Sequence, residues 1–318
     1  TVFALKAKPL TRLALSSAGT GSVVAWLTTG GGGNTELDAQ LLDGAGAKLG
    51  NQVVVSIATT NGEPAVAGNA GGFWVAWTNK VVEDSQSDKG VALQRFDLAG
   101  QPVGDVVVAN AGNQNGADPT LGDQSNPAVT VNAAGQAIVV WQSAAIPKGL
   151  YGQAFAANGS SASAVTALAA TGDVPALLWS GTEALLAAVV TNASGGVGQD
   201  IQVRHLDIKL ASPGPLALAN SFTAGNQTQP TLALGATGGF LLGWTSEKAA
   251  DSTSGLDICA RDVAPVVGFS GGELVVTKTP ATGDQDQPFL VPFADGRVLQ
   301  LWRSKATSGG GVIEGLFR

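Results

Sequence analysis

One pattern recurs along this chain and restricts what it can fold into: a proline, a short apolar strand, a glycine turn, and a second apolar strand ending in tryptophan. Clear copies are PAVAGNAGGFWVAW (64–77), PAVTVNAAGQAIVVW (127–141), PTLALGATGGFLLGW (230–244) and PFLVPFADGRVLQLW (288–302). A repeat that runs through the whole chain indicates an array of similar structural units. Because the recurring residues are those that a packed sheet needs, the repeat says more about architecture than about activity.

The tryptophan at the end of the second strand indicates the number of repeat units. Six positions align on it: Trp26, Trp77, Trp141, Val190, Trp244 and Trp302, with Val190 in place of tryptophan. They lie roughly 50–65 residues apart, which suits a four-stranded propeller blade with loops of variable length. The third strands are predicted at 37–43, 91–97, 150–156, 201–207, 256–262 and 312–318. With 44 glycines and few charges, the sequence predicts an all-β fold, a six-bladed β-propeller of four-stranded antiparallel blades.

The second strand of each unit is apolar at nearly every position instead of alternating with polar residues. Such a strand is typical of a sheet that is covered on both faces. Trp74 and Trp77 lie three residues apart on one strand, so they point to opposite faces. We therefore expect both side chains in the core between neighbouring blades, and not on a sugar-stacking surface.

The chain is predicted to form a single domain, residues 1–318, because the repeat leaves no room for a second one. The predicted blades are 11–63, 64–126, 127–174, 175–229, 230–287, and 288–318 together with 1–10. The last unit stops without a fourth strand, and the β-like segment 1–8 precedes the first unit. We predict that segment 1–8 pairs with 312–318 and closes the ring, since an open array leaves unpaired strand edges.

The loops that join the second strand to the third, and one unit to the next, are long and polar, whereas the other turns are short and rich in glycine. Binding residues concentrate on variable loops held by a rigid scaffold, so we expect the long-loop face to carry function. The sharpest motif on it is G-[DN]-Q-x-[NQ]-P, at 122–127, 225–230 and 283–288. Its polar residues are the predicted binding residues: Asp123, Gln124, Asn126, Asn226, Gln227, Gln229, Asp284, Gln285, Asp286 and Gln287.

The motif has two interpretations. Its carboxylate and amide oxygens suit a polar ligand or Ca²⁺. Alternatively, Asn, Asp and Gln before a proline hydrogen-bond the turn that leads into the strand, and recurrence in several units favours this structural role. No cofactor is predicted, with Ca²⁺ as the one possibility, and no metal ligands are assigned.

Little in the sequence suggests enzyme chemistry. The single histidine, His205, aligns with residues of other kinds in the other units, namely Leu41, Arg95, Ala154 and Ala260. We therefore expect it at the surface or at a sheet edge. No catalytic residue is assigned. Carboxylate pairs such as Asp284 and Asp286 are able in principle to perform acid–base chemistry, but sequence does not give their separation. The lone Cys259 lies on an apolar strand and is predicted to be a core residue.

Charge and hydropathy exclude some classes of binding partner. The formal net charge is −7 and Lys and Arg do not cluster, so neither nucleic acid nor an anionic membrane surface is an expected partner. No apolar stretch has the length of a membrane span. The sequence contains no methionine, and we expect a cleaved export signal upstream of Thr1 and a periplasmic, cell-surface or extracellular location.

A Trp strand, a polar loop, a strand such as ALQRFD, a turn such as LAGQPVG and a Q-x-x-P start of the next strand follow one another along the chain. This succession resembles the degenerate β-propeller blade repeats of large exported and surface-associated bacterial proteins. The resemblance implies a propeller fold and export, and it supplies no catalytic residues.

We predict from these observations a non-enzymatic interaction module that binds a protein or cell-surface partner through its long-loop face. Two alternatives stay open. One is a carbohydrate-binding lectin, which predicts exposed aromatic residues in the loops. The other is a Ca²⁺-dependent or carboxylate-based hydrolase with its site in the central channel.

Overall fold

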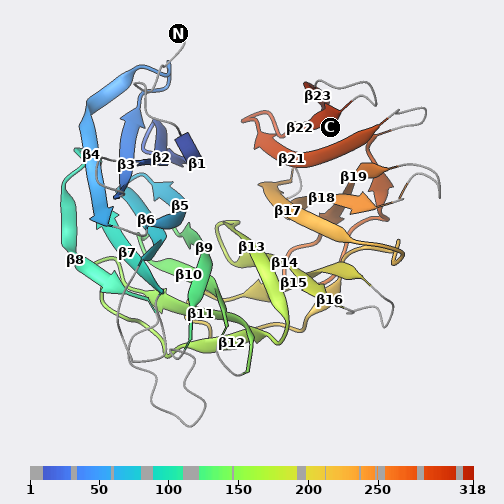
Figure 1. Cartoon of the computed structure of the whole chain (residues 1–318), viewed down its shortest axis with the longest axis horizontal. Coiled ribbons are helices and arrows are strands. Elements are labelled where there is room, and N and C mark those ends of the chain that lie inside the picture. The colour runs from blue at the N-terminus through green and yellow to red at the C-terminus, as the bar shows by residue number, and fades with distance from the viewer. Residues whose placement is uncertain are drawn as a thin grey trace. The chain divides into compact units, whose positions relative to one another are not determined.

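The computed structural model contains short strands joined by turns (Figure 1). It describes residues 10–29, 34–58, 61–79, 89–109, 122–144, 147–191, 198–211, 213–235, 238–247, 249, 255–277, 283–305 and 311–318. Two compact units make up the chain: the first is residues 1–170 with 208–211, and the second is residues 171–207 with 212–318. Among the described residues no helix has the length and apolar character needed to cross a membrane.

The first unit holds three antiparallel sheets, each with its four strands in chain order. The first sheet comprises β1 (Leu10–Ala18), β2 (Gly21–Thr29), β3 (Thr35–Leu42) and β4 (Lys48–Ala58). The second comprises β5 (Gly62–Asn69), β6 (Gly72–Asn79), β7 (Gly90–Phe96) and β8 (Pro102–Val108). The third comprises β9 (Gln124–Val131), β10 (Ala137–Ser143), β11 (Gly149–Phe155) and β12 (Thr166–Ala169).

The second unit holds the remaining three sheets, again with neighbouring strands in chain order. The fourth comprises β13 (Gly172–Trp179), β14 (Ala184–Thr191), β15 (Gln199–Leu206) and β16 (Ala217–Leu218). The fifth comprises β17 (Gln227–Leu234), β18 (Phe240–Glu247), β19 (Leu256–Val263) and β20 (Leu274–Val275). The sixth has three described strands, β21 (Asp284–Pro292), β22 (Val298–Lys305) and β23 (Gly311–Phe317).

These six sheets confirm the predicted all-β fold with six blades. The predicted pairing of segment 1–8 with 312–318 lies outside the described residues and stays a prediction, because residues 1–9 are not among them.

The second strand of the second sheet is buried on both faces, as its composition predicts. Trp74 packs in one core cluster with Val139 and Trp141 of the third sheet. Trp77 packs in a separate cluster with Val23 and Leu27 of the first sheet. Both tryptophans are 1% exposed, so they form the core between sheets of the first unit and are not available to stack on a ligand.

The strand that opens most blades carries a bulge at its proline. A positive φ occurs at the residue before the proline in five sheets: Glu63, Asn126, Val174, Gln229 and Gln287. At each of these sites the pairing with the second strand skips two residues. Proline cannot donate to the ladder, so a bulge is where a sheet accommodates it. The strands therefore begin before the proline, and not after it as predicted.

Each bulge lies opposite the tryptophan of the second strand in the sheets that have one at this place, namely Trp77, Trp141, Trp244 and Trp302. In the fourth sheet the residue opposite the bulge is Ala188, between Ala187 and Val189. The alignment of Val190 with the tryptophans is therefore wrong by two residues. A shift of two leaves every side chain on the same face, so the apolar pattern does not reveal it.

A side chain on the third strand ties the fourth strand, or the segment that leads into it, to the sheet. In five sheets it donates to the backbone carbonyl of the residue ten positions later. The pairs are Gln40 to Gly50 (3.5 Å), Gln94 to Gly104 (3.1 Å), Gln153 to Ser163 (3.0 Å), Arg204 to Gly214 (2.6 Å) and Arg261 to Gly271 (2.9 Å). The amide or guanidinium satisfies carbonyls that irregular pairing of the outer strand leaves without a ladder partner.

These five side chains form a column of equivalent positions, and the column shows that the alignment of the third strand in the fifth sheet is wrong. Arg261, and not Cys259, matches Arg204, so Asp262 and not Ala260 occupies the position of His205. In the sixth sheet Leu316 pairs with Gln300 at the corresponding register. An apolar residue suffices there because no fourth strand follows it among the described residues.

The column predicts a stability effect for Gln94→Ala. The Gln94 amide also donates to the carbonyls of Arg95 and Val103, and its removal leaves partly buried carbonyls unpaired. We expect the free energy of unfolding to fall by about 1–3 kcal/mol, measured by urea denaturation. Exposed Gln101 is the control, and Gln101→Ala is expected to change stability by less than about 0.5 kcal/mol. Equal effects of the two variants would contradict the assigned role.

Candidate functional site

The first glutamine of each G-[DN]-Q-x-[NQ]-P motif has a buried side chain. Gln124, Gln227 and Gln285 are 0%, 0% and 2% exposed. Their amides donate to the carbonyls of Gly122 (2.8 Å), Ala224 (3.3 Å) and Gly283 (2.9 Å), in the turns before β9, β17 and β21. These side chains hold the turns that lead into the first strand of each sheet. Their burial keeps them from an incoming ligand.

The motif residues of the third sheet contact their own sheet. Asn126 donates through Nδ2 to Oε1 of Gln142 at 2.9 Å, and Gln142 directly follows Trp141 on β10. The backbone carbonyl of Asp123 accepts from the N–H of Ala144 at 2.9 Å. Both Asp123 and Asn126 are partly exposed.

Asn226 and Asp284 interact with neighbouring segments of the second unit. The backbone N–H and Nδ2 of Asn226 donate to Oε2 of Glu247 at 3.0 and 3.2 Å. Oδ1 of Asp284 accepts from the backbone N–H of Leu256, at the start of β19, at 3.2 Å. Asp284 is partly exposed. The first contact holds the turn before β17 against the end of β18, and the second holds the start of β21 against the start of β19.

Two exposed glutamines come together at the bulges of β17 and β21. Oε1 of Gln229 accepts from Oγ1 of Thr245 at 2.9 Å and from the backbone N–H of Gln287 at 2.8 Å. Two donors on one oxygen fix the orientation of the Gln229 amide and leave its NH₂ group as the donor. Both glutamines have the left-handed φ of the bulge, 56° and 55°, and bulges often redirect side chains near binding sites.

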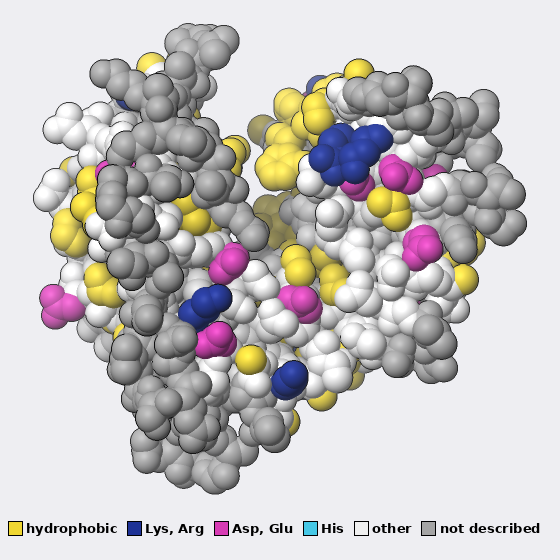
Figure 2. Space-filling model, viewed as in Figure 1, with side chains coloured by type: hydrophobic (Ala, Val, Ile, Leu, Met, Phe, Trp, Pro, Cys, Tyr) yellow, Lys and Arg dark blue, Asp and Glu magenta, His cyan; other side chains and the backbone are white. Residues whose placement is uncertain are grey.

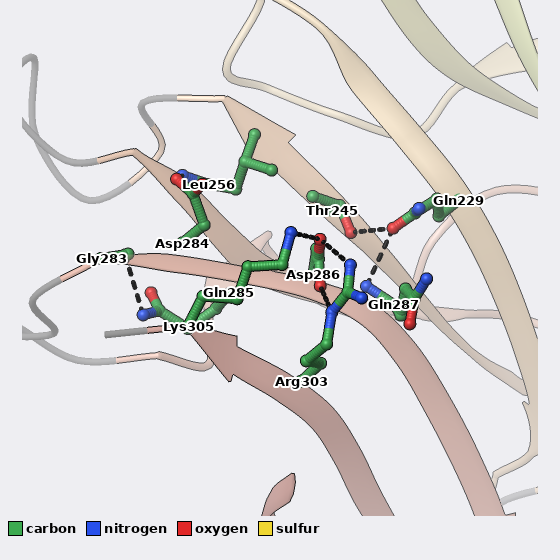
Figure 3. Close-up of polar contacts among 10 residues, drawn as sticks. All are labelled: Gln229, Thr245, Leu256, Gly283, Asp284, Gln285, Asp286, Gln287, Arg303 and Lys305. Carbon is green, nitrogen blue, oxygen red and sulfur yellow. Dashed lines mark hydrogen bonds and ion pairs between the residues drawn. The ribbon is translucent and has the colours of Figure 1, made fainter. Parts of the chain in front are cut away.

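Beside them lies an ion cluster centred on Asp286 (Figure 3). Its carboxylate accepts from Nε and Nη2 of Arg303, both at 2.6 Å, and Nζ of Lys305 lies 3.1 Å from Oδ2. The side chain of Asp286 is 7% exposed, while those of Arg303 and Lys305 are 35% and 44% exposed. The carboxylate therefore lies beneath two cations that reach solvent.

The charge states of this cluster follow from its contacts. Hydrogen bonds from Arg303 and then Lys305 lower the pKa of Asp286, against the opposing effect of burial. The same pairing raises the pKa of Arg303. The pairing therefore keeps Asp286 and Arg303 charged near neutral pH, and the ammonium group of Lys305 lies beside them. Figure 2 shows Lys and Arg side chains gathered over the sheet of β21 and β22.

We define the β21 rim as Gln229, Thr245, Asp284, Asp286, Gln287, Arg303 and Lys305. Of these, Gln229, Asp284, Asp286 and Gln287 are predicted from the sequence, whereas Thr245, Arg303 and Lys305 are missed. A sequence signal for Thr245 and Arg303 is their position directly after the tryptophan of the second strand. In four sheets this residue hydrogen-bonds a polar residue just before the proline of the first strand. Thr78 donates to Glu63, Gln142 accepts from Asn126, Thr245 donates to Gln229, and Arg303 donates to Asp286.

The single histidine lies elsewhere and is buried. His205 is 8% exposed, and its Nδ1 lies 3.1 Å from Oε2 of Glu183. Oε1 of Glu183 accepts from the backbone N–H of Val266 at 2.7 Å. The expectation of a surface or edge histidine is wrong, because the turn before β14 brings Glu183 against it.

Other chemistry is limited. Within the described ranges, no group of three or more His, Cys, Asp or Glu side chains is arranged to hold a metal ion. The possibility of Ca²⁺ stays a prediction that the structure does not test. Cys259 is fully buried, and burial together with Glu273 raises the pKa of its thiol far above the ordinary value. It is therefore a core residue.

Comparison with known proteins gives the fold. No family model and no curated protein matches the sequence. Among solved structures, a protein of unknown function from Dyadobacter fermentans aligns with a TM-score of 0.59 at 12% identity, over 97% of this chain and 94% of that one. A neuraminidase-like protein of subtype N11 from a flat-faced bat influenza A virus aligns with a TM-score of 0.52 at 9% identity, over 98% and 87%.

A Trypanosoma rangeli sialidase, solved in complex with sialic acid, aligns with a TM-score of 0.51 at 11% identity. The alignment covers 97% of this chain and 53% of the sialidase, so the chain spans about half the length of that protein. These likenesses agree with the six sheets and establish the β-propeller fold.

The same comparison overturns the predicted function. A non-enzymatic module for a protein or cell-surface partner was expected, but the solved structures that share the fold include sialidases. The preference for a protein partner and for the absence of enzyme activity is therefore contradicted.

The ion cluster predicts a pH effect. Asp286 has a lowered folded-state pKa, so its stabilisation is present above the unfolded pKa of about 3.9 and is lost as the pH falls through the folded value. We expect Asp286→Asn to destabilise the protein at pH 6–7, with the difference from wild type shrinking below about pH 4. Thermal melts across this pH range measure it.

Asp295→Asn is the matched control, because Asp295 forms an exposed ion pair with Arg297 in the turn before β22. Arg297 lowers the pKa of Asp295 too, but solvent screens an exposed pair, so the control should stay close to wild type at every pH. A pH-independent difference between wild type and Asp286→Asn would contradict the assigned ion pair.

Proposed function

We propose that the chain is a carbohydrate-active enzyme of the glycoside hydrolase type that binds its saccharide at the β21 rim. The observation that carries the proposal is the gathering of hydrogen-bond donors near the starts of β17 and β21 and at the end of β22 in the second unit. Arg303, Lys305, and the amides of Gln229 and Gln287 come from three strands and are all partly or fully exposed. Saccharide hydroxyl groups are recognised by such sets of oriented polar groups.

The fold supports the proposal. The sialidase that shares it was solved with a bound sugar acid, and a second sialidase of microbial origin aligns with a TM-score of 0.51. Because one fold supports many functions, the proposal depends on the site and not on the likeness alone.

The carboxyl groups of β21 have different proposed roles. Asp286 is covered by its two cations, so it acts as a positioning residue that fixes the Arg303 guanidinium. Asp284 is partly exposed, and its carboxylate accepts a hydrogen bond from the backbone of Leu256. Glycoside hydrolysis requires a carboxyl group that exchanges a proton with the substrate. Within the β21 rim, Asp284 is the group that fits this role.

The test uses a panel of 4-methylumbelliferyl glycosides, with release of the fluorophore as the readout. We expect hydrolysis of at least one member, and a fall of about 10²–10⁴-fold in kcat for Asp284→Asn, with KM little changed. Asp286→Asn should instead raise KM, because Arg303 loses its fixed orientation. Asp295→Asn should retain wild-type values.

Two results would overturn the proposal. One is the absence of turnover of every glycoside by a folded protein. If that protein nevertheless binds a saccharide, the lectin alternative replaces the hydrolase. The other is full activity of Asp284→Asn and Asp286→Asn, which would place the site elsewhere.

A further inference from the structure

We propose that the saccharide taken at the β21 rim carries an anionic group, a carboxylate or a sulfate ester, which pairs with Lys305 and with the outward edge of Arg303. This inference rests on the proposed function and specifies its substrate class. It is argued from the charges of the rim.

The cations keep donors that Asp286 does not use. Arg303 donates to the carboxylate through Nε and Nη2. The protons of Nη1 and the second proton of Nη2 are therefore directed away from Asp286. Lys305 makes one contact with Asp286, through Nζ to Oδ2, and an ammonium group has three donors. One internal carboxylate therefore leaves both cations able to bind a second anion.

The geometry places those donors on the solvent side. The Asp286 side chain is 7% exposed beneath Arg303 and Lys305, which are 35% and 44% exposed. An approaching ligand thus meets N–H donors and not the carboxylate. Figure 3 shows Asp284, the other acidic residue of the rim, turned toward the backbone of Leu256, while both cations converge on Asp286.

The neighbouring side chains suit a sugar that bears the anion. Gln229 is locked through its Oε1 by Thr245 and by the backbone of Gln287, so its exposed NH₂ group is a fixed donor for hydroxyl oxygens. Guanidinium and ammonium groups form charge-assisted bonds with carboxylate and sulfate oxygens that exceed neutral hydrogen bonds in strength. Although the chain as a whole carries a net charge of −7, Arg303 and Lys305 provide a local positive charge that an acidic ligand can bind.

The test compares acidic saccharides with neutral counterparts, by isothermal titration calorimetry on the full chain. The probes are trigalacturonate and its methyl ester, sialyllactose and lactose, and galactose 6-sulfate and galactose. We expect at least one acidic member to bind about tenfold or more tightly than its neutral counterpart, with affinity falling as salt rises. The carboxylate and sulfate pairs distinguish the two sources of the anion.

The diagnostic variant is Lys305→Met, which keeps the bidentate Arg303–Asp286 pair and so the local fold. We expect it to weaken binding of the acidic probe about tenfold and to weaken binding of the neutral counterpart clearly less. Arg297→Gln is the control, because Arg297 is an exposed cation outside the rim, and it should bind like wild type. Equal loss in both variants would indicate a general charge effect and overturn the assignment.

The outcomes separate the inference from the proposed function. Hydrolysis or binding of neutral saccharides with no preference for acidic ones overturns the inference and leaves the function intact. Failure to bind or cleave any saccharide overturns both.

Discussion

The burial of both faces of the second strand in the first five sheets is the constraint on which the rest of the structure depends. In the sixth sheet, β22 alternates buried and partly exposed residues. In the first unit, β6 sends Trp74 into one core cluster and Trp77 into another, and in the second unit β18 does the same with Leu241 and Trp244. Because neither face of such a strand is exposed to solvent, exposed polar side chains cannot lie along its length. Chemistry is therefore confined to the strand ends and the turns.

Two devices make this packing possible. The pre-proline bulge admits a residue without a donor N–H while keeping the strand in its sheet, at the cost of a left-handed φ in five non-glycine residues. The Gln or Arg of the third strand satisfies the carbonyls of the irregular outer strand. The bulge also places polar side chains at the start of the strand, where Gln229 and Gln287 meet, so the device that stabilises the fold also supplies the proposed site.

Much of the fold is readable from the sequence, because apolar strands, glycine turns and recurring tryptophans report burial directly. The six sheets and the core positions of Trp74 and Trp77 follow from that pattern. Register within a blade does not: Val190 was aligned in place of Ala188 because a shift of two preserves the face. The buried His205 was missed because its partner, Glu183, approaches from a turn that the strand pattern does not describe.

The candidate site is only half predictable. A motif search along the first strand finds Gln229, Asp286 and Gln287, but Arg303 and Lys305 lie on the second strand and become neighbours only through antiparallel pairing. The function is harder still, since every recurring residue serves the scaffold and the scaffold supports unrelated activities.

The most direct test of the central claim is native-state hydrogen exchange of the backbone amides, resolved by strand. If the second strands are buried on both faces, amides of β6, β10, β14 and β18 exchange only through global unfolding and are the slowest in the chain. The outer strands β8 and β20 exchange faster. Exchange in β6 and β18 as fast as in β8 and β20 would contradict the account.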